Sequence, residues 1–192
     1  MKKTFLKSFI MLISMTVLMS CSKSDEDINY NSDDLLGEWN LASYTYSGNF
    51  DVSNGTISLY TGNFEGRAIN IDATTTFTEN PNKANYSGSY DLSVQQSDSN
   101  GQTTQDTYVI GNTTSVVDWE LRDNLLILSN GELVEVDLPD EISSFTNIGD
   151  GDLEIIELTS NSLKLRKSID QNISQGGATA IIKLDIAIDY TR

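Results

Sequence analysis

The chain has 192 residues, of which 28 are acidic, 12 are basic and one is cysteine; it has no histidine, and its pI is about 4.1. Without histidine, neither a Ser/His/Asp nor a Cys/His nucleophile can form, and a single cysteine excludes an internal disulfide and a thiolate zinc site. The chemistry that remains is that of carboxylates, hydroxyls and lysines, in a length that fits one domain.

Residues 1–20 have the pattern of a secretion signal. Lys2, Lys3 and Lys7 precede an apolar run over 9–19, which is shorter than the roughly 20 residues of a membrane span. The run ends in Leu18-Met19-Ser20-Cys21, which resembles a bacterial lipobox. This resemblance implies that Cys21 becomes a lipidated N-terminus carrying palmitate-like chains, which anchor stably at about 0.8 kcal/mol per buried methylene. An ordinary cleavage site that contains a cysteine is the alternative.

Removal of the signal makes the charge of the chain more negative. Three basic residues and no acidic residue are lost, so nine basic residues remain against 28 acidic ones, a net charge of −19. Such a domain repels nucleic-acid phosphates and anionic lipid headgroups. We therefore expect no nucleic-acid partner, a monomer, and membrane attachment only through the lipid on Cys21.

Residues 21–34 are predicted to be an acidic, flexible tether. Five of the 13 residues after Cys21 are acidic, and a flexible segment of this length spans roughly 20 Å. Lys23 followed by Asp25-Glu26-Asp27 resembles the export signal of surface lipoproteins in one Gram-negative phylum. That resemblance implies an outer-membrane lipoprotein exposed on the cell surface; a spacer that faces the periplasm is the alternative.

Beyond residue 36 the apolar residues recur with the period of two that is typical of half-buried strands. The segments 67–78 and 86–95 show it most clearly, and Asn80-Pro81-Asn82 predicts a hairpin turn between them. The side chains expected on one face are Ile69, Ile71, Ala73, Thr75 and Phe77 in the first segment, and Tyr86, Gly88, Tyr90, Leu92 and Val94 in the second.

The same alternation marks further strands. They are 38–46, 56–60, 105–110, 116–121, 125–129, 132–138, 153–158, 163–169 and 180–190. The segment 153–158 breaks the alternation, which indicates a bulge, and the segments 95–106 and 139–152 are predicted loops. Because some segments merge, we expect an all-β, single antiparallel up-and-down barrel of about 8 to 10 strands, with a two-sheet β-sandwich as the alternative.

The start of the first strand, Gly37-Glu38-Trp39, resembles the Gly-x-Trp signature of the lipocalin-like domains of bacterial surface lipoproteins. Further pieces that are similar to this pattern follow in order: 76–82, 87–90, 118–121 before 125–127, and 156–159 before 163–165. The resemblance implies that residues 35–192 form one lipocalin-like β-barrel domain. It also implies that the barrel encloses a small apolar or amphipathic ligand.

Aromatic side chains are the candidate ligand contacts, and they are Tyr44, Tyr86, Tyr90, Tyr108 and Trp119. If they line a hollow barrel, they provide an amphipathic wall for a small molecule. If the barrel is filled by its own side chains, they belong to the core. Exposed rings would instead stack on sugars, which makes a surface glycan- or protein-binding accessory the alternative function.

The acidic loop 147–157 does not fit an EF-hand. With Gly151 at loop position six, the first and third ligand positions fall on Thr146 and Ile148, which supply no carboxylate. A looser calcium site stays open, but we expect no metal and no cofactor. No acidic residue stands in an aromatic context that would mark a catalytic acid, so we expect a binding protein and not an enzyme.

The two ends of the domain are predicted to meet. In the lipocalins that this sequence resembles, an arginine after the last strand packs across the Gly-x-Trp indole, and Arg192 is the basic residue placed to do so over Trp39. In a closed barrel the first and last strands are neighbours. Both residues would then be structural residues of the closed end; a frayed, solvated Arg192 is the alternative.

Overall fold

The computed structural model describes residues 30–134, 136–143 and 151–192. Eight strands and two single-turn helices follow one another along the chain. They are α1 (Ser32–Leu35), β1 (Gly37–Asn54), β2 (Ile57–Thr78), β3 (Lys83–Asp98), β4 (Thr103–Arg122), β5 (Leu125–Ser129), α2 (Asp140–Ser143), β6 (Gly151–Leu158), β7 (Ser162–Gln175) and β8 (Ala178–Thr191).

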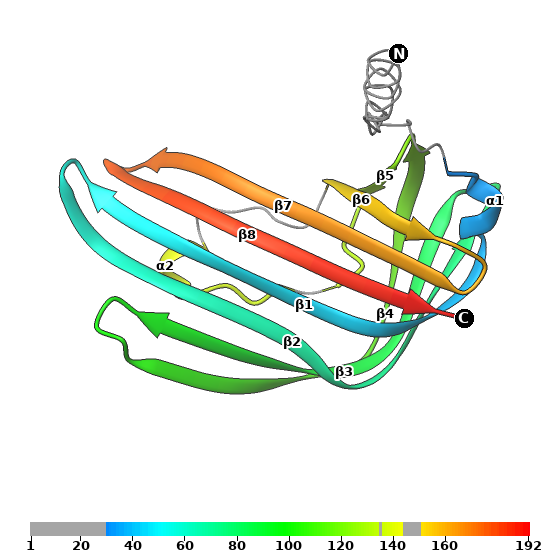
Figure 1. The fold of residues 1–192 in the computed structure, drawn as a ribbon, viewed down its shortest axis with the longest axis horizontal. Helices are drawn as coiled ribbons and strands as arrows, with labels where there is room; N and C mark the ends of the chain where they lie inside the picture. The colour runs from blue at the N-terminus through cyan, green and yellow to red at the C-terminus, as the bar shows by residue number, and fades with distance from the viewer. Residues whose placement is uncertain (1–29, 135, 144–150) are drawn as a thin grey trace, which may run out of the picture.

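Each strand pairs antiparallel with the next, and β8 pairs with β1, so the sheet closes in a ring (Figure 1). This confirms the all-β, up-and-down architecture at the lower end of the predicted strand count. The two-sheet sandwich is wrong, because one continuous sheet contains every strand. Inward side chains alternate along the strands and fill the ring with a single apolar core.

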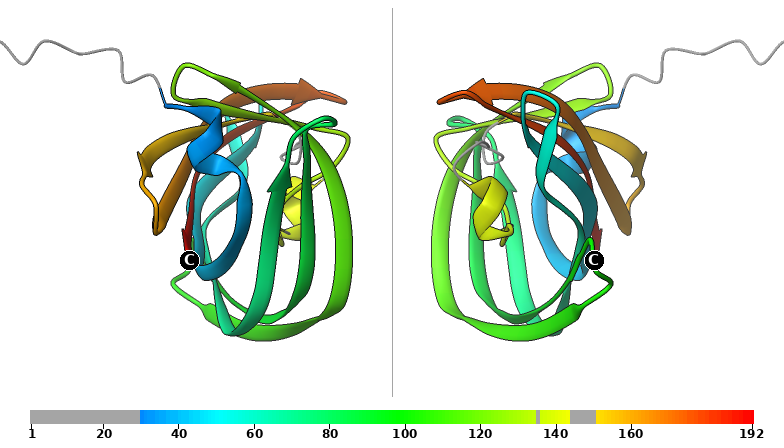
Figure 2. Two further views of the ribbon diagram at one scale, coloured as in Figure 1. Left: turned by 90° about the vertical axis from the view of Figure 1, so that its right-hand side faces the viewer. Right: turned by 90° about the vertical axis from the view of Figure 1, so that its left-hand side faces the viewer.

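The ring is complete only near one end, because β5 and β6 are short. β5 pairs with β4 along 118–122, and β6 pairs with β7 from Leu163 to Arg166. Beyond these pairs, the long arms of β4 and β7 have a strand neighbour on one side only. Part of the β5–β6 connection fills this gap: Leu133 and Ile142 are buried in the core, and Figure 2 shows α2 enclosed by the curved strands.

Several predicted strand limits are wrong. The predicted loop 95–106 is the tip of a hairpin, since β3 runs to Asp98 and β4 begins at Thr103. This tip extends past the core, so its two faces are both polar and no alternation marks it. Conversely, the predicted strand 132–138 contains no strand among its described residues. Its alternating apolar side chains pack into the gap of the ring instead.

A bulge also changes the predicted face of β2. The β2–β3 register shifts between Ile69 and Asp72, and Asn70 has a φ of 53°. The strand therefore presents Ala68 and Ile71 to the core, and Ile69 does not share the face of Ile71 as predicted. The bulge expected in 153–158 is confirmed, because the β6–β7 register shifts between Ile155 and Glu157.

The domain begins earlier than predicted. Asn31 caps α1 by accepting a hydrogen bond from the backbone N–H of Asp33 (3.1 Å), and Leu35 is fully buried. Residues 32–34, predicted to belong to the flexible tether, are therefore helical. Cys21 and the acidic residues 25–27 lie outside the described residues. Within the described ranges, no helix is both long and apolar enough to cross a membrane.

Candidate functional site

The predicted contact between the two ends of the domain is confirmed. The Cζ of Arg192 lies 3.9 Å from the centroid of the Trp39 ring, and the indole Nε1 donates to the carbonyl of Leu35 (2.8 Å). The Arg192 guanidinium also donates to the carbonyls of Asp34 (3.3 Å), Leu35 (3.4 Å) and Leu36. Arg192 thus satisfies carbonyls at the end of α1, and this closed end is held together as one unit.

Gly37 has a specific role in this arrangement. Its φ is 111°, a conformation that side chains rarely adopt, and a Cβ there would lie 3.4 Å from Nη2 of Arg192. The glycine of the Gly-x-Trp signature therefore turns the chain from α1 into β1 beneath the arginine.

Trp119, predicted as a ligand contact, belongs to the same closed end. Its ring packs edge-on against Phe77 with the centroids 6.1 Å apart, and its Nε1 donates to the carbonyl of Thr78 (3.1 Å). Because the ring is almost fully buried and its polar atom is satisfied, Trp119 is a structural residue.

Two of the four candidate tyrosines are core residues. Tyr44 and Tyr90 are buried and meet edge to face, with their ring centroids 6.2 Å apart. Their neighbour Tyr46 donates from its hydroxyl to the carbonyl of Asp137 (2.8 Å), which ties β1 to the β5–β6 connection. These contacts favour the filled-core interpretation over a hollow barrel.

Tyr86 lies beside an inner pocket of about 260 Å³. The pocket is lined by Tyr86, Tyr90, Ile110, Thr113, Ser115 and residues 132–134. The Tyr86 hydroxyl is buried near Thr113 but makes no hydrogen bond of normal geometry. Burial raises the pKa of Tyr86 to about 12, so this phenol stays protonated at neutral pH. The Tyr86 hydroxyl is therefore a buried polar group without a hydrogen-bond partner among the described residues, beside a small pocket.

Tyr108 is separated from the other tyrosines on the long arm of β4, where 43% of its surface is exposed. The negative charge of Asp137, followed by partial desolvation and the charges of Asp106 and Asp140, raises the pKa of Tyr108. Burial and the charges of Asp140 and Asp106 raise the pKa of Asp137 in turn. Three carboxylates therefore gather beside this arm of β4.

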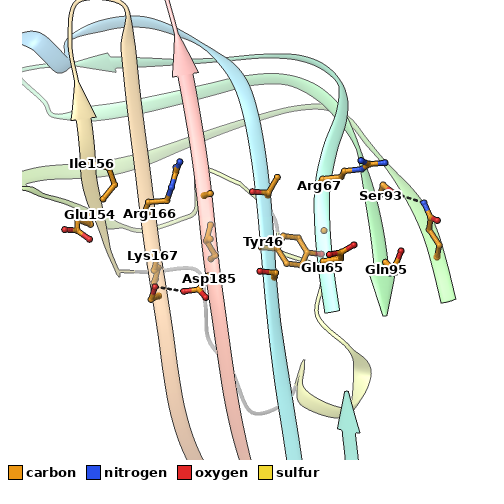
Figure 3. Close-up of a pocket in the computed structure, with 17 residues that line it drawn as sticks. Tyr46, Glu65, Arg67, Ser93, Gln95, Glu154, Ile156, Arg166, Lys167 and Asp185 are labelled. Carbon is orange, nitrogen blue, oxygen red and sulfur yellow. Dashed lines mark hydrogen bonds between the residues drawn. The ribbon is translucent and has the colours of Figure 1, made fainter. Parts of the chain in front are cut away.

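A groove lies on the outside of the sheet. This outer groove has a volume of about 970 Å³ and crosses seven strands, from β6 to β4 (Figure 3). The side chains that line it are Thr45, Ser47, Glu65, Arg67, Ser93, Gln95, Gln105, Glu154, Ile156, Arg166, Ser168, Asp185 and Ala187. Tyr46, Gly66 and Ile186 are buried on the inner face of the sheet, so their backbone forms part of the floor. Lys167, which stands opposite Ile186 in the strand register, also lines the groove.

The strand register builds the outer groove as two rows of directly opposed residues. One row runs from Arg166 through Ala187, Thr45 and Arg67 to Ser93. The second runs from Ser168 through Asp185, Ser47, Glu65 and Gln95 to Gln105. Opposed residues on one face of an antiparallel sheet lie about 5 Å apart, so the second row is a continuous line of hydrogen-bonding groups and the first is interrupted only by Ala187.

Arg67 differs from the other described basic side chains. Lys83, Arg122, Lys164, Arg166 and Lys183 form ion pairs, Arg192 covers Trp39, and Lys167 is also engaged. Arg67 alone among them makes neither an ion pair nor a hydrogen bond. An unpartnered guanidinium in so acidic a domain leaves five donors available to a ligand in the groove.

Charges in the outer groove nearly balance. Glu65, Glu154 and Asp185 oppose Arg67, Arg166 and Lys167, whereas the chain as a whole carries −16. Polar contacts hold parts of the lining in place: Gln105 donates to the Ser93 hydroxyl (3.2 Å), and Ser168 donates to Asp185 (2.5 Å). The site is thus pre-ordered, locally neutral and able both to donate and to accept.

The described part of the loop 147–157 holds no convergent carboxylates. Glu154 accepts a hydrogen bond from Asn124 (3.2 Å), and Glu157 forms an ion pair with Lys164 (2.7 Å). The described residues contain no group of three or more acidic, cysteine or histidine side chains placed to hold a metal. Residues 147–150 lie outside the described ranges.

Sequence reasoning missed the outer groove, because outward positions of a strand read as ordinary solvated surface. One signal was present: Arg67 is the only basic residue between Ser24 and Asn82. Its partners across the sheet were hidden because residues 95–106 were predicted to be a loop, and because bulges and pairing decide which polar residues stand opposite it.

Comparisons with protein-family models, with curated proteins and with solved structures find no match to this chain. The lipocalin-like resemblance of residues 35–192 therefore stays a prediction that depends on its own residues.

Proposed function

We propose that this protein is a lipid-anchored lipoprotein of the outer membrane, exposed on the cell surface, which binds a neutral glycan in the outer groove without transforming it. The observation that carries the proposal is the unpartnered Arg67 within a groove of hydroxyl, amide and carboxylate side chains. The anchor and the location rest on the Leu-Met-Ser-Cys run and the acidic segment after it.

The chemistry of the groove suits a sugar chain better than an apolar ligand. Sugar hydroxyls both donate and accept hydrogen bonds, and the two rows supply partners of both kinds over six strands. Ile156, which is 49% exposed, adds an apolar contact at the β6 end. A polyanion is disfavoured, because the groove is lined by three acidic and three basic residues, so it has no excess of positive charge, and the surrounding field is negative.

Titration calorimetry of the full lipoprotein in detergent against a panel of neutral oligosaccharides tests this function. We expect at least one member of the panel to bind, and Arg67→Ala to weaken that binding by about tenfold or more, since a hydrogen bond to a charged group contributes about 1.5 to 3 kcal/mol. Gln95→Ala, in the second row, should weaken it less.

Arg122→Ala is the matched control. It also removes one arginine, but Arg122 is 62% exposed, pairs with Glu120 and lies outside the groove. Equal affinity in the Arg67→Ala and Arg122→Ala variants would show that the oligosaccharide does not bind at Arg67. Failure of every oligosaccharide to bind would contradict a glycan function.

A second candidate function is the binding of a small amphipathic molecule in the inner pocket, and the buried Tyr86 hydroxyl favours it. The pocket is slightly smaller than the roughly 300 to 1,000 Å³ of common ligand sites. Phenol is a suitable probe, because it offers a ring and one hydroxyl. Tyr86→Phe should reduce phenol binding while leaving stability unchanged or higher; unchanged phenol binding would remove the role of this hydroxyl.

A further inference from the structure

The long arm of β4 has a free edge. From Thr103 to Val109 the strand pairs with β3 on one side, and no hydrogen bond joins its backbone to any other described segment. The backbone groups on the opposite side therefore point to solvent. An unpaired row of this kind is a template for one more strand.

This edge is open along its whole length. All seven residues from Thr103 to Val109 are exposed, and Val109 reaches 78%. The free arm of β7 differs, since its residues from 167 to 174 alternate between half-buried and exposed. Natural edge strands are commonly protected by proline or lysine, and Thr103–Val109 contains neither.

The charges beside the edge are negative. Asp106 is the only charged residue from Thr103 to Val117, and Asp137 and Asp140 stand close enough to act on Tyr108. Neither Asp106 nor Asp137 forms an ion pair with a described residue, so a strand added here would meet two available carboxylates.

We propose that the Thr103–Val109 edge docks an extended segment of another protein that carries lysine or arginine. The segment adds to β4 as a strand through backbone hydrogen bonds, and its basic side chains lie against Asp106 and Asp137. A second copy of this chain is a poorer occupant, because its own β4 arm offers no cation and residues 35–192, with 8 basic against 23 acidic residues, carry −15 in each copy.

The test uses a synthetic, capped seven-residue peptide of alternating lysine and valine, added to the full lipoprotein in detergent. Hydrogen exchange followed by mass spectrometry reports where the peptide binds. We expect amides of Thr103–Val109 to exchange at least tenfold more slowly with peptide, while the free arm of β7 is unchanged. The control peptide has proline in place of each valine, which keeps the charge, removes the N–H donor of every second residue and fixes φ near −65°, away from the strand conformation; it should give no protection.

Asp106→Asn should weaken the lysine–valine peptide about two- to fivefold at low salt, an effect that salt reduces. Asp51→Asn, on β1, removes the same charge three strands away and should leave the affinity unchanged.

Equal protection by the proline peptide would overturn strand addition, since only charge would then matter. Protection of the β7 arm alone would overturn the choice of edge, and protection that grows with protein concentration in the absence of peptide would assign the edge to a second copy.

Discussion

Arg192, the last residue of the chain, covers the indole of Trp39, the third residue of the first strand, and its guanidinium donates to three consecutive carbonyls at the end of α1. The side chain of Arg192 therefore joins the end of β8 to α1 and covers the buried ring of Trp39. Arg192 is thus a structural residue.

A double-mutant cycle measures this contact. Trp39→Phe and Arg192→Ala should each lower the denaturant midpoint, and their coupling energy should be about 0.5 to 2 kcal/mol, as for a partly desolvated guanidinium over an indole. Arg192→Lys keeps the charge but loses the planar fork, so it should recover only part of the loss. A coupling energy of zero would mean that the two side chains do not interact in solution.

Gly88 should tolerate no side chain. Its φ is 140°, and a Cβ there would lie 2.2 Å from the backbone oxygen of Asp72 in the neighbouring strand. Gly88→Ala should therefore lower the free energy of unfolding by about 2 to 4 kcal/mol. Gly111→Ala is the matched control, because a Cβ there meets nothing within 4 Å. Similar urea midpoints for the two variants would contradict the close approach of β2 and β3.

Asp137 should make stability depend on pH. Burial and the charges of Asp140 and Asp106 raise its pKa above the ordinary 3.8, so the folded state holds this proton more tightly than the unfolded chain. Stability is then lost as pH rises from about 4 through the folded pKa. Asp137→Asn should be more stable than the wild type at pH 7 and equal to it at pH 3, in urea titrations at both values.

Asp118 should change the pH dependence of stability in the opposite direction, so it serves as the control for Asp137. Hydrogen bonds from Lys83 and Asn130 lower the pKa of Asp118. Its stabilising effect is present above the ordinary value of 3.8 and is lost as pH falls through the lower folded pKa. Asp118→Asn should therefore be less stable than the wild type at pH 7. The same direction for both variants at pH 7 would contradict these assignments.

Cys21→Ser should release the protein from membranes. Without the proposed signal the chain has a net charge of −19, which anionic headgroups repel, so loss of the acyl chains proposed for Cys21 should shift it into the soluble fraction. Detergent extraction and mass spectrometry of the N-terminus check both the partition and the acylation. If the Cys21→Ser variant stays in the membrane fraction to the same extent as the wild type, the proposed lipid anchor is contradicted.

Replacing Asp25, Glu26 and Asp27 by alanine should leave acylation intact and reduce exposure on the cell surface. Protease added to whole cells should then digest less of the variant than of the wild type. Equal digestion would show that this acidic cluster is only a spacer.

The sequence alone determined the architecture, the closed end and the chemistry that is absent. Alternation of apolar and polar residues predicts half-buried strands because a strand places successive side chains on opposite faces, and it identified β2, β3, β7 and β8. Trp39 and Arg192 were predicted to meet because the sequence resembles lipocalins, in which an arginine after the last strand packs across the Gly-x-Trp indole, and because a closed up-and-down sheet makes its first and last strands neighbours. The lack of histidine and of paired cysteines removed whole reaction classes before any fold was known.

Only the tertiary structure decided where the polar sites lie. Alternation shows which face of a strand is buried, but it carries no information about which outward residue stands opposite another. The bulge near Asn70 sets the register that brings Arg67 beside Ser93. Because β5 and β6 are short, the arm of β4 has a strand neighbour, β3, on one side only. The residues of this arm resemble those of any exposed polar segment. Both features depend on strand pairing between residues far apart in the chain, and that pairing is fixed by core packing and not by local pattern.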